Sequence, residues 1–256
     1  MVALSYFKRQ GILNFSMKFQ QIDPNRPLGG RYKVIRRLGE GGFGQTFLAK
    51  DMHLPGRPIC VVKQLKPQFN DAGSLQTARR LFDTEARVLY KLGEHDQIPR
   101  LLAHFEDNQE FYLAQEFIEG GTLDDVMTPG QPWSEAQVIA LLQEILQVLT
   151  FVHQQNVIHR DIKPANLICR RDGKIVLIDF GAVKQVSTQL HNSKTGRTDM
   201  TIAIGTQGYM PNEQLDGRPR FSSDIYAVGM IGVQGLTSLY PAHLKQDPRT
   251  SEIKWR

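Results

Sequence analysis

Short apolar runs with turn residues between them make up most of the first half of the chain and predict strands. Strands of this length joined by short turns are typical of an antiparallel sheet. One segment differs: its apolar residues recur near helical spacing and end at Gly93, which predicts a helix over residues 75–93. The predicted strands are residues 32–38, 45–51 and 59–65, followed by a hairpin of residues 100–107 and 110–117.

The pattern changes after Gly120 and Gly121. Residues 134–155 have apolar side chains nearly all round, which predicts a buried helix. Ser134 and Gln137 form an S-x-x-Q capping box, so we expect this helix to begin sharply.

A hairpin and a second apolar helix follow. Asp172-Gly173 separates the apolar runs 166–170 and 174–180, as in a β-hairpin turn. Residues 222–236 predict the helix, with Ser222 or Ser223 near its cap. The chain is therefore expected to have a sheet-rich half with one helix and then a helix-rich half, meeting near residues 116–122, after a tail of residues 1–30.

Composition narrows the class of protein. Of 256 residues, 41% are hydrophobic and 22% charged, as in an ordinary globular protein, and the net charge of +5 comes from scattered residues. Cys60 and Cys169 lie in apolar strand-like runs, and we expect both to be reduced thiols. No run approaches the ~18 apolar residues of a membrane span, and the N-terminus lacks the features of a signal peptide. We therefore expect a cytoplasmic protein with no membrane span.

Glycines 39, 41 and 44 form a G-x-G-x-x-G motif between two predicted strands. Glycine lets main-chain N–H groups approach phosphate oxygens, but the motif alone is weak and a plain β-turn is an equal alternative. A dinucleotide-binding fold would need a helix after it, and residues 45–51 are not helical. Strands on both sides instead favour a flap over a nucleotide.

Lys63 lies in a strand whose neighbours predict burial. A lysine in a strand is normally a solvated edge charge, whereas a buried ammonium group needs a partner. Glu85 in the predicted helix is the preferred partner, and Asp83 is a rival because the helix rotation is not set by the sequence.

Residues 159–166 read HRDIKPAN, and IDFG follows at residues 178–181. The hairpin between them can bring Asp161 and Asp179 to one cleft, where two carboxylates and the Asn166 amide suit Mg²⁺ rather than zinc. A solvated loop with a hydrogen-bonded histidine is the alternative for any one of these residues, but it explains the whole set poorly.

A fourth stretch, GTQGYMPNEQ at residues 205–214, is typical of a surface loop when taken alone. In combination with GEGGFGQT, VVK, HRDIKPAN and DFG, in that order, it resembles the protein kinases, specifically the bacterial eukaryotic-like serine/threonine protein kinases. The resemblance runs from about Tyr32 to the end of the chain. It implies an α+β, bilobal fold: an N-lobe of about residues 31–115, a hinge of about 116–121 and a C-lobe of about 122–256.

The resemblance also implies roles in transfer of the γ-phosphoryl group of ATP to Ser/Thr hydroxyls of proteins. Lys63, paired with Glu85, holds the α- and β-phosphates, and Asp161 accepts the hydroxyl proton, supported by Lys163 and Thr206. Asn166 and Asp179 hold two Mg²⁺ ions, with Mn²⁺ as the substitute ion. Gln115 takes the gatekeeper position. The implied nucleotide-binding set is Leu38, Gly39, Glu40, Gly41, Gly42, Phe43, Gly44, Gln45, Thr46, Val61, Lys63, Glu116, Ile118 and Ile168.

Arg160 precedes the expected catalytic Asp, a position that in this family commonly binds a phosphorylated residue of the activation segment, here residues 179–213. The resemblance therefore implies autophosphorylation in that segment, and self-association through it. The candidate acceptors are Thr198 and Thr201, with Thr195 and Ser193 behind them.

The chain departs from the family pattern in several places. Val61 replaces the usual Ala, Thr46 a common Val, and Asn212 the Pro of A-P-E. Only 32 residues follow Asp224, so the C-lobe is expected to be incomplete, to expose apolar surface and to leave Glu213 without its usual Arg. The alternative function is therefore a nucleotide-binding scaffold without transfer activity. A small-molecule kinase is disfavoured by Lys163 and the GTQGYMPNE loop, and scattered basic residues argue against nucleic acid.

Overall fold

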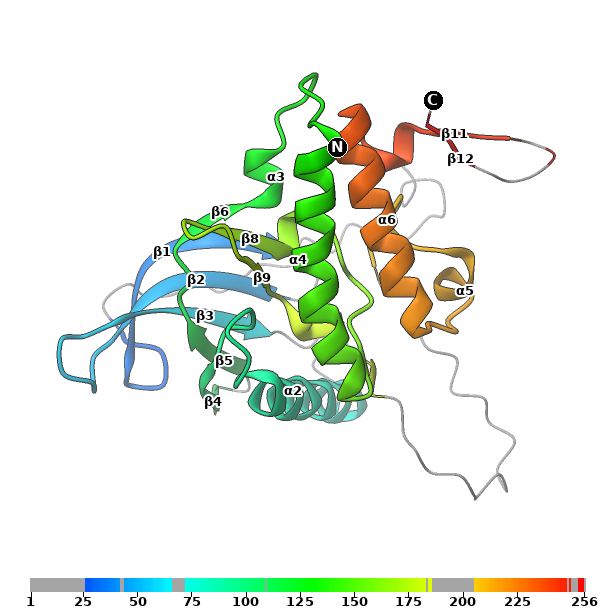
Figure 1. The fold of residues 1–256 in the computed structure, drawn as a ribbon. Coiled ribbons are helices and arrows are strands. Elements are labelled where there is room, and N and C mark those ends of the chain that lie inside the picture. The colour runs from blue at the N-terminus through cyan, green and yellow to red at the C-terminus, as the bar shows by residue number, and fades with distance from the viewer. Residues whose placement is uncertain are drawn as a thin grey trace, which may run out of the picture.

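The computed structural model describes residues 26–41, 44–65, 72–108, 110–182, 184–185, 205–247, 249 and 253–255. Its N-terminal half is a five-stranded sheet in the order β1-β2-β3-β5-β4, with every neighbouring pair antiparallel (Figure 1). One long helix, α2, packs against β4 and β5. This confirms the predicted sheet and its single helix. The elements are β1 Tyr32–Gly41, β2 Gly44–Asp51, β3 Ile59–Leu65, α2 Ala72–Leu92, β4 Leu101–Asp107 and β5 Glu110–Glu116.

Alternation of buried and less buried residues along β2 and β3 gives the sheet two different faces. On one face Tyr32, Cys60 and Val62 are almost fully buried in a small cluster that also contains Leu28. The opposite face of β3 carries Lys63. Because successive strand residues point to opposite faces, the same alternation that builds the small core directs Lys63 away from it.

The C-terminal half is mainly helical, and α4 and α6 lie side by side in it. A small sheet, β6-β8-β9, lies beside these helices and ends in the loops that carry Asn166 and Asp179. The elements are β6 Gly120–Thr122, α3 Leu123–Val126, α4 Glu135–Gln154, β7 Val157–Ile158, η2 Pro164–Asn166, β8 Leu167–Arg170, β9 Ile175–Leu177, η3 Phe180–Ala182, β10 Lys184–Gln185, α5 Asn212–Leu215, α6 Phe221–Thr237, η4 Pro241–His243, β11 Lys245–Gln246 and β12 Ile253–Lys254.

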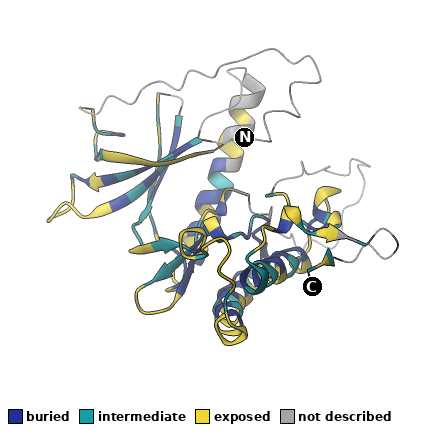
Figure 2. Ribbon diagram, turned by 90° about the horizontal axis from the view of Figure 1, so that it is seen from above, coloured by how far each residue is buried: buried dark blue, intermediate teal, exposed yellow. Residues whose placement is uncertain are grey.

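The helix α4 begins as predicted but is less buried than predicted. Ser134 caps it, and the Ser134 and Gln137 side chains each bond the other's main-chain N–H. The prediction of burial all round is wrong for Ile139 and Leu146, which are 48% and 38% exposed, because only one side of α4 packs on the core (Figure 2). Within the described part of the chain, α4 alone has the length and hydropathy of a membrane-crossing helix. Its buried face makes it a core helix of this fold.

The start of α6 confirms the prediction that Ser222 or Ser223 lies near its cap. The N-cap is Arg220, and Ser222 and Ser223 lie in the first helical turn. The Ser223 hydroxyl accepts a hydrogen bond from the Arg220 N–H at 3.0 Å, so this serine satisfies the helix start from inside the helix. The hairpin turn at Asp172-Gly173 is confirmed, with Gly173 at φ 86° between β8 and β9.

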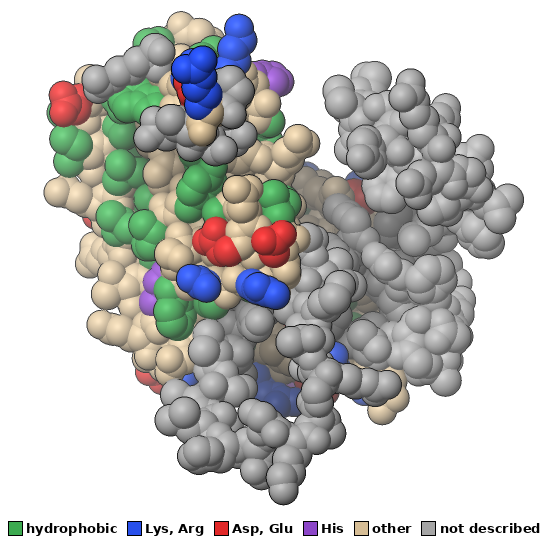
Figure 3. All heavy atoms as spheres, turned by 90° about the vertical axis from the view of Figure 1, so that its right-hand side faces the viewer, with side chains coloured by type: hydrophobic (Ala, Val, Ile, Leu, Met, Phe, Trp, Pro, Cys, Tyr) green, Lys and Arg blue, Asp and Glu red, His purple; other side chains and the backbone are tan. Residues whose placement is uncertain are grey.

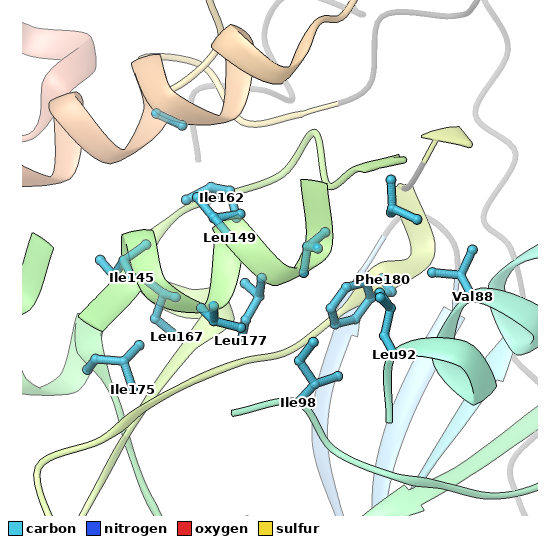
Figure 4. Close-up of a cluster of buried hydrophobic side chains, with 14 of the residues drawn as sticks. Val88, Leu92, Ile98, Ile145, Leu149, Ile162, Leu167, Ile175, Leu177 and Phe180 are labelled. Atoms are coloured by element: carbon cyan, nitrogen blue, oxygen red, sulfur yellow. The ribbon is translucent and has the colours of Figure 1, made fainter. Parts of the chain in front are cut away.

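A large hydrophobic core joins the two halves (Figure 4). Val88 and Leu92 of α2 reach Phe180, which is fully buried, and Ile98 lies beside them. On the other side of Phe180 the same core contains Ile145 and Leu149 of α4 and Leu167, Ile175 and Leu177 of the small sheet. Phe180, the residue directly after Asp179, therefore helps to position α2.

The side of the molecule that carries α5 and α6 shows hydrophobic side chains at its surface (Figure 3). Leu215 of α5 and Ile225 of α6 are 50% and 45% exposed, and Leu239, just after α6, is 51% exposed.

Candidate active site

The glycine-rich motif forms the end of the β1–β2 hairpin, as its flanking strands predicted. Gly39 lies opposite Thr46 and Gly41 opposite Gly44 in the register. Gly44 has φ 155°, and a Cβ there would lie 1.7 Å from the Gln64 carbonyl oxygen. Only glycine fits this close approach of β2 to β3. Gly42 and Phe43 lie outside the described residues.

Lys63 lies at the centre of an ionic cluster that joins three elements. Its Nζ is 2.9 Å from Glu85 Oε1 of α2 and 2.6 Å from Asp179 Oδ1, just before η3. Glu85 is therefore the helix partner, and Asp83 makes no ion pair among the described residues. A Cβ at Gly181 would lie 2.6 Å from Lys63 Nζ, so the glycine of IDFG leaves room for the ammonium group.

Burial and charge act against each other in this cluster. Burial alone would lower the pKa of the Lys63 ammonium group, but the two carboxylates together outweigh it and raise that pKa. The pKa of Asp179 is lowered to about 2, chiefly by the charge of Lys63. Burial raises the pKa of Glu85. Lys63 and Asp179 are therefore both charged at neutral pH, and the site keeps an anionic group, Asp179, with 44% of its side chain exposed.

The HRDIKPAN segment places its polar side chains around one carboxylate. The Thr206 hydroxyl donates to Asp161 Oδ1 at 2.8 Å, and Lys163 Nζ lies 2.8 Å from Asp161 Oδ2. Lys163 Nζ also donates to the Thr206 hydroxyl at 2.9 Å. Asn166 Nδ2 donates to the Asp161 carbonyl at 2.8 Å and to its Oδ2 at 3.0 Å. The structure thus brings together the three residues expected at the reacting hydroxyl, Asp161, Lys163 and Thr206, and places Asn166, expected at the metal, beside them.

Asp224 holds the main chain of this segment from α6. It is 1% exposed, and its two oxygens each accept one main-chain N–H, from His159 and Arg160, both at 2.9 Å. Arg160 has φ 70°, a left-handed conformation that is strained for a non-glycine residue. The His153 ring lies 2.8 Å from Asp224 Oδ2 as a further partner. No local pattern predicted the contact of His153, since its partner is 71 residues away.

We expect Asp224→Ala to lower the free energy of unfolding by about 2–5 kcal/mol, because two buried N–H donors would lose their acceptor. Urea unfolding followed by circular dichroism measures this change. Asp216→Ala removes an exposed carboxylate nearby and should stay within about 0.5 kcal/mol of wild type. Equal stabilities for the two variants would contradict the anchoring role of Asp224.

The groups in the cleft fit a metal–nucleotide complex better than a preassembled metal site. Within the described residues no cluster of three or more His, Cys, Asp or Glu side chains could hold a metal ion. Asp179 offers carboxylate oxygens, and Asn166, whose amide nitrogen is used by Asp161, offers its amide oxygen. Mg²⁺ is commonly bound by one or two such oxygen ligands together with phosphate oxygens.

The expected adenine-binding residues lie where the two halves meet. Val61 pairs with Gln115, and Cys60 with Glu116, so the residues expected as gatekeeper and as first residue of the hinge end β5 beside β3. Ile168 of β8 pairs with Thr122 just after the hinge. Leu38 is 40% exposed near the end of β1. Ile118 lies in the segment between β5 and β6.

Two further expectations concern the activation segment. Glu213 Oε1 accepts a hydrogen bond from the Ser223 hydroxyl at 2.8 Å, so this carboxylate has a partner on α6. Arg160 lies within the HRDIKPAN segment and is 8% exposed. The candidate phosphate acceptors Ser193, Thr195, Thr198 and Thr201 lie outside the described residues.

Comparisons with known proteins agree with this geometry. The model of the Protein kinase domain family matches residues 32–255. Serine/threonine-protein kinase B of Synechocystis sp. is 47% identical over 231 residues, which cover 89% of this chain and 40% of that protein. Serine/threonine-protein kinase PknA of Nostoc sp. is 46% identical, with 89% and 41% covered. Serine/threonine-protein kinase PrkC of Bacillus subtilis is 31% identical over 84% of this chain. The chain thus spans about two fifths of the length of the first two relatives.

Proposed function

The chain belongs to the protein kinase family, and on that premise we propose that it transfers the γ-phosphoryl group of ATP to serine and threonine hydroxyls of protein substrates. The observation that carries the proposal is the pair of charged clusters that the structure forms: Lys63 with Glu85 and Asp179, and Asp161 with Lys163 and Thr206. Their charges suit phosphoryl transfer, which needs charge neutralisation and in-line positioning more than a strong base.

Each side chain has a task that follows from its position. Lys63 binds the α- and β-phosphates, and Glu85 keeps its ammonium group directed into the cleft. Asp161 orients the substrate hydroxyl and accepts its proton. Lys163, 2.8 Å from Asp161, is a cation beside the transferred group. Thr206 fixes both side chains through its hydroxyl.

Asn166 and Asp179 would hold the divalent ion of the nucleotide complex, for which we propose Mg²⁺ with Mn²⁺ as a substitute. The bound ion supplies neutralisation of the phosphate charge. The same reasoning assigns main-chain contacts with phosphate to glycines 39, 41 and 44, and with adenine to Glu116 and Ile118. We further propose a cytoplasmic location, protein partners only, and no role for nucleic acid.

Labelled ATP tests the substrate class. Incubation with [γ-³²P]ATP, Mg²⁺ and a generic basic protein should give acid-stable phosphoserine or phosphothreonine on hydrolysis of the product. Label found only as phosphotyrosine, or on a small-molecule acceptor and not on protein, would contradict the proposal. The relatives are named serine/threonine-protein kinases, so a scaffold without transfer activity is the less favoured function.

We also propose autophosphorylation in the activation segment, with Arg160 as the group that pairs with the phosphate. After incubation with MgATP, mass spectrometry should find phosphate on Thr198 or Thr201. Wild-type protein that phosphorylates a substrate but carries no phosphate between residues 187 and 201 would remove this part of the proposal. An Asp161→Asn sample treated in parallel shows how much phosphate arises without transfer activity.

A further inference from the structure

The segment that connects α2 to β4 contacts the first residue of the hinge in two ways. The Glu116 N–H donates to the Arg100 carbonyl at 2.9 Å. The Arg100 side chain returns to the same residue, with Nε 3.1 Å from Glu116 Oε2 and Nη2 3.5 Å from Oε1. Arg100 therefore holds both the main chain and the side chain of Glu116, and the two nitrogens of the guanidinium match the fork of the carboxylate.

The same segment also contacts the strand beside the end of the hinge. Arg170 of β8 lies opposite Gly120 of β6, and its Nη1 donates to the Asp96 carbonyl at 3.2 Å. The Asp96 carboxylate forms an ion pair with Lys174 on the same hairpin. A Cβ at Gly120 would lie 2.3 Å from the Cys169 carbonyl oxygen, so β6 and β8 are in close contact here. Within residues 96–100, Arg100 thus contacts Glu116 at the start of the hinge. Asp96 contacts Arg170 of β8, which lies opposite Gly120 near the end of the hinge.

The buried side chain of Gln97 attaches this segment to β9. Gln97 is 1% exposed, and its Nε2 donates to the Ile175 carbonyl of β9 at 2.9 Å. The Leu177 N–H donates to the Gln97 carbonyl, also at 2.9 Å. The segment belongs in sequence to the N-terminal half, but its main chain is fixed to a strand of the C-terminal half. Arg100 therefore extends from a segment that is hydrogen-bonded to β9.

Electrostatic interactions connect Arg170 of β8 with both Asp96 and Glu116. The pKa of the Arg170 guanidinium is raised, mainly by its hydrogen bond to Asp172, and the carboxylates of Asp96 and Glu116 add to the effect. Glu116 thus interacts with Arg100 directly and with Arg170 at longer range. Removal of either arginine would leave the Glu116 carboxylate less restrained, and with it the main chain that leads to Ile118.

We propose that residues 96–100 form a brace behind the hinge, in which Arg100 is a positioning residue for nucleotide binding. The proposal rests on the proposed function, because it assigns adenine to the main chain of residues 116–118. Arg100 acts through Glu116 and touches no substrate atom. Holding that main chain in one conformation before ATP arrives lowers the entropy lost on binding, so the brace acts on nucleotide affinity and not on the transfer step.

Direct binding of a fluorescent ATP analogue with Mg²⁺ tests this inference. For Arg100→Gln we expect a Kd about two- to fivefold weaker than wild type, in the range of one exposed ion pair. The kcat at saturating ATP should stay within about twofold of wild type, so that the effect appears in KM alone. Arg79→Gln is the matched control, since Arg79 donates from Nη2 to both oxygens of exposed Glu106 away from the hinge, and its Kd should equal that of wild type.

Glu116→Gln should weaken binding of the analogue as much as Arg100→Gln does. The double variant should bind the analogue no more weakly than either single variant. Arg100→Lys keeps the charge and should lie between wild type and Arg100→Gln. A Kd for Arg100→Gln equal to that of Arg79→Gln, a tighter Kd, or additive losses in the double variant would overturn the inference. Failure of the proposed function gives a different result, in which wild type binds the analogue but transfers no phosphate.

Discussion

Asp161→Asn is expected to reduce kcat for phosphoryl transfer by about 10²–10⁴-fold while leaving the affinity for ATP within about twofold. The substitution keeps the shape of the side chain and its place beside Thr206 and Lys163, but it removes the charge that orients the substrate hydroxyl and accepts its proton. Because Asp161 is expected to contact the hydroxyl and not the nucleotide, the loss should appear in kcat. Steady-state kinetics with a fluorescent-nucleotide titration separates the two quantities.

A matched carboxylate shows whether the loss is specific. Asp216 is exposed at the end of α5, so Asp216→Asn should keep wild-type kcat. If Asp161→Asn retained more than about a tenth of wild-type kcat, the assignment of Asp161 would be wrong. A loss in ATP affinity with unchanged kcat would instead place this carboxylate at the nucleotide.

Lys63→Met is the second substitution with a large expected effect, and it acts on stability as well as on activity. Glu85 is 5% exposed and would lose the cation that compensates its burial. Breaking a buried pair by removing one partner costs about 3–5 kcal/mol, and we expect a loss of this size in the free energy of unfolding. Phosphoryl transfer should fall to background, because no ammonium group would remain for the phosphates.

The double variant Lys63→Met/Glu85→Gln separates these two effects. Replacing the unpaired carboxylate by a neutral amide should return at least about 1 kcal/mol of the stability lost in Lys63→Met, and it should return no activity. Lys50→Met removes an exposed lysine from the neighbouring strand and should change neither quantity. If the double variant were as unstable as Lys63→Met alone, the Lys63–Glu85 pair would not be the source of the loss.

Much of the fold could be predicted because local pattern and tertiary contacts agree. The strands of the first half, the helix before Gly93 and the capping box at Ser134 each depend on residues within a few positions of one another. The exposed face of α4 could not be predicted in this way. Ile139 and Leu146 have the same local pattern as Ile145, and only the packing of the other elements decides which of them is buried.

The candidate site, too, could be predicted only in part from the sequence. The order of the motifs predicted which residues meet, but helix rotation left Asp83 and Glu85 as alternatives until the structure placed Glu85 at Lys63. His153 at Asp224 and Arg100 at Glu116 had no local signal, because each contact joins segments that become neighbours only in the folded chain. At the start of α6, by contrast, the predicted serine lies at the cap, where Ser223 bonds the Arg220 N–H from inside the helix.

The role of Asp161 in phosphoryl transfer is tested by the rate of γ-phosphoryl transfer to a serine or threonine hydroxyl, measured at saturating MgATP for wild type and Asp161→Asn side by side. Nucleotide titration should first show that both proteins bind ATP equally, so that rates are compared per active site. We expect wild type to transfer the phosphoryl group at least about 100-fold faster than Asp161→Asn. Equal rates for two proteins that bind ATP equally well would contradict it.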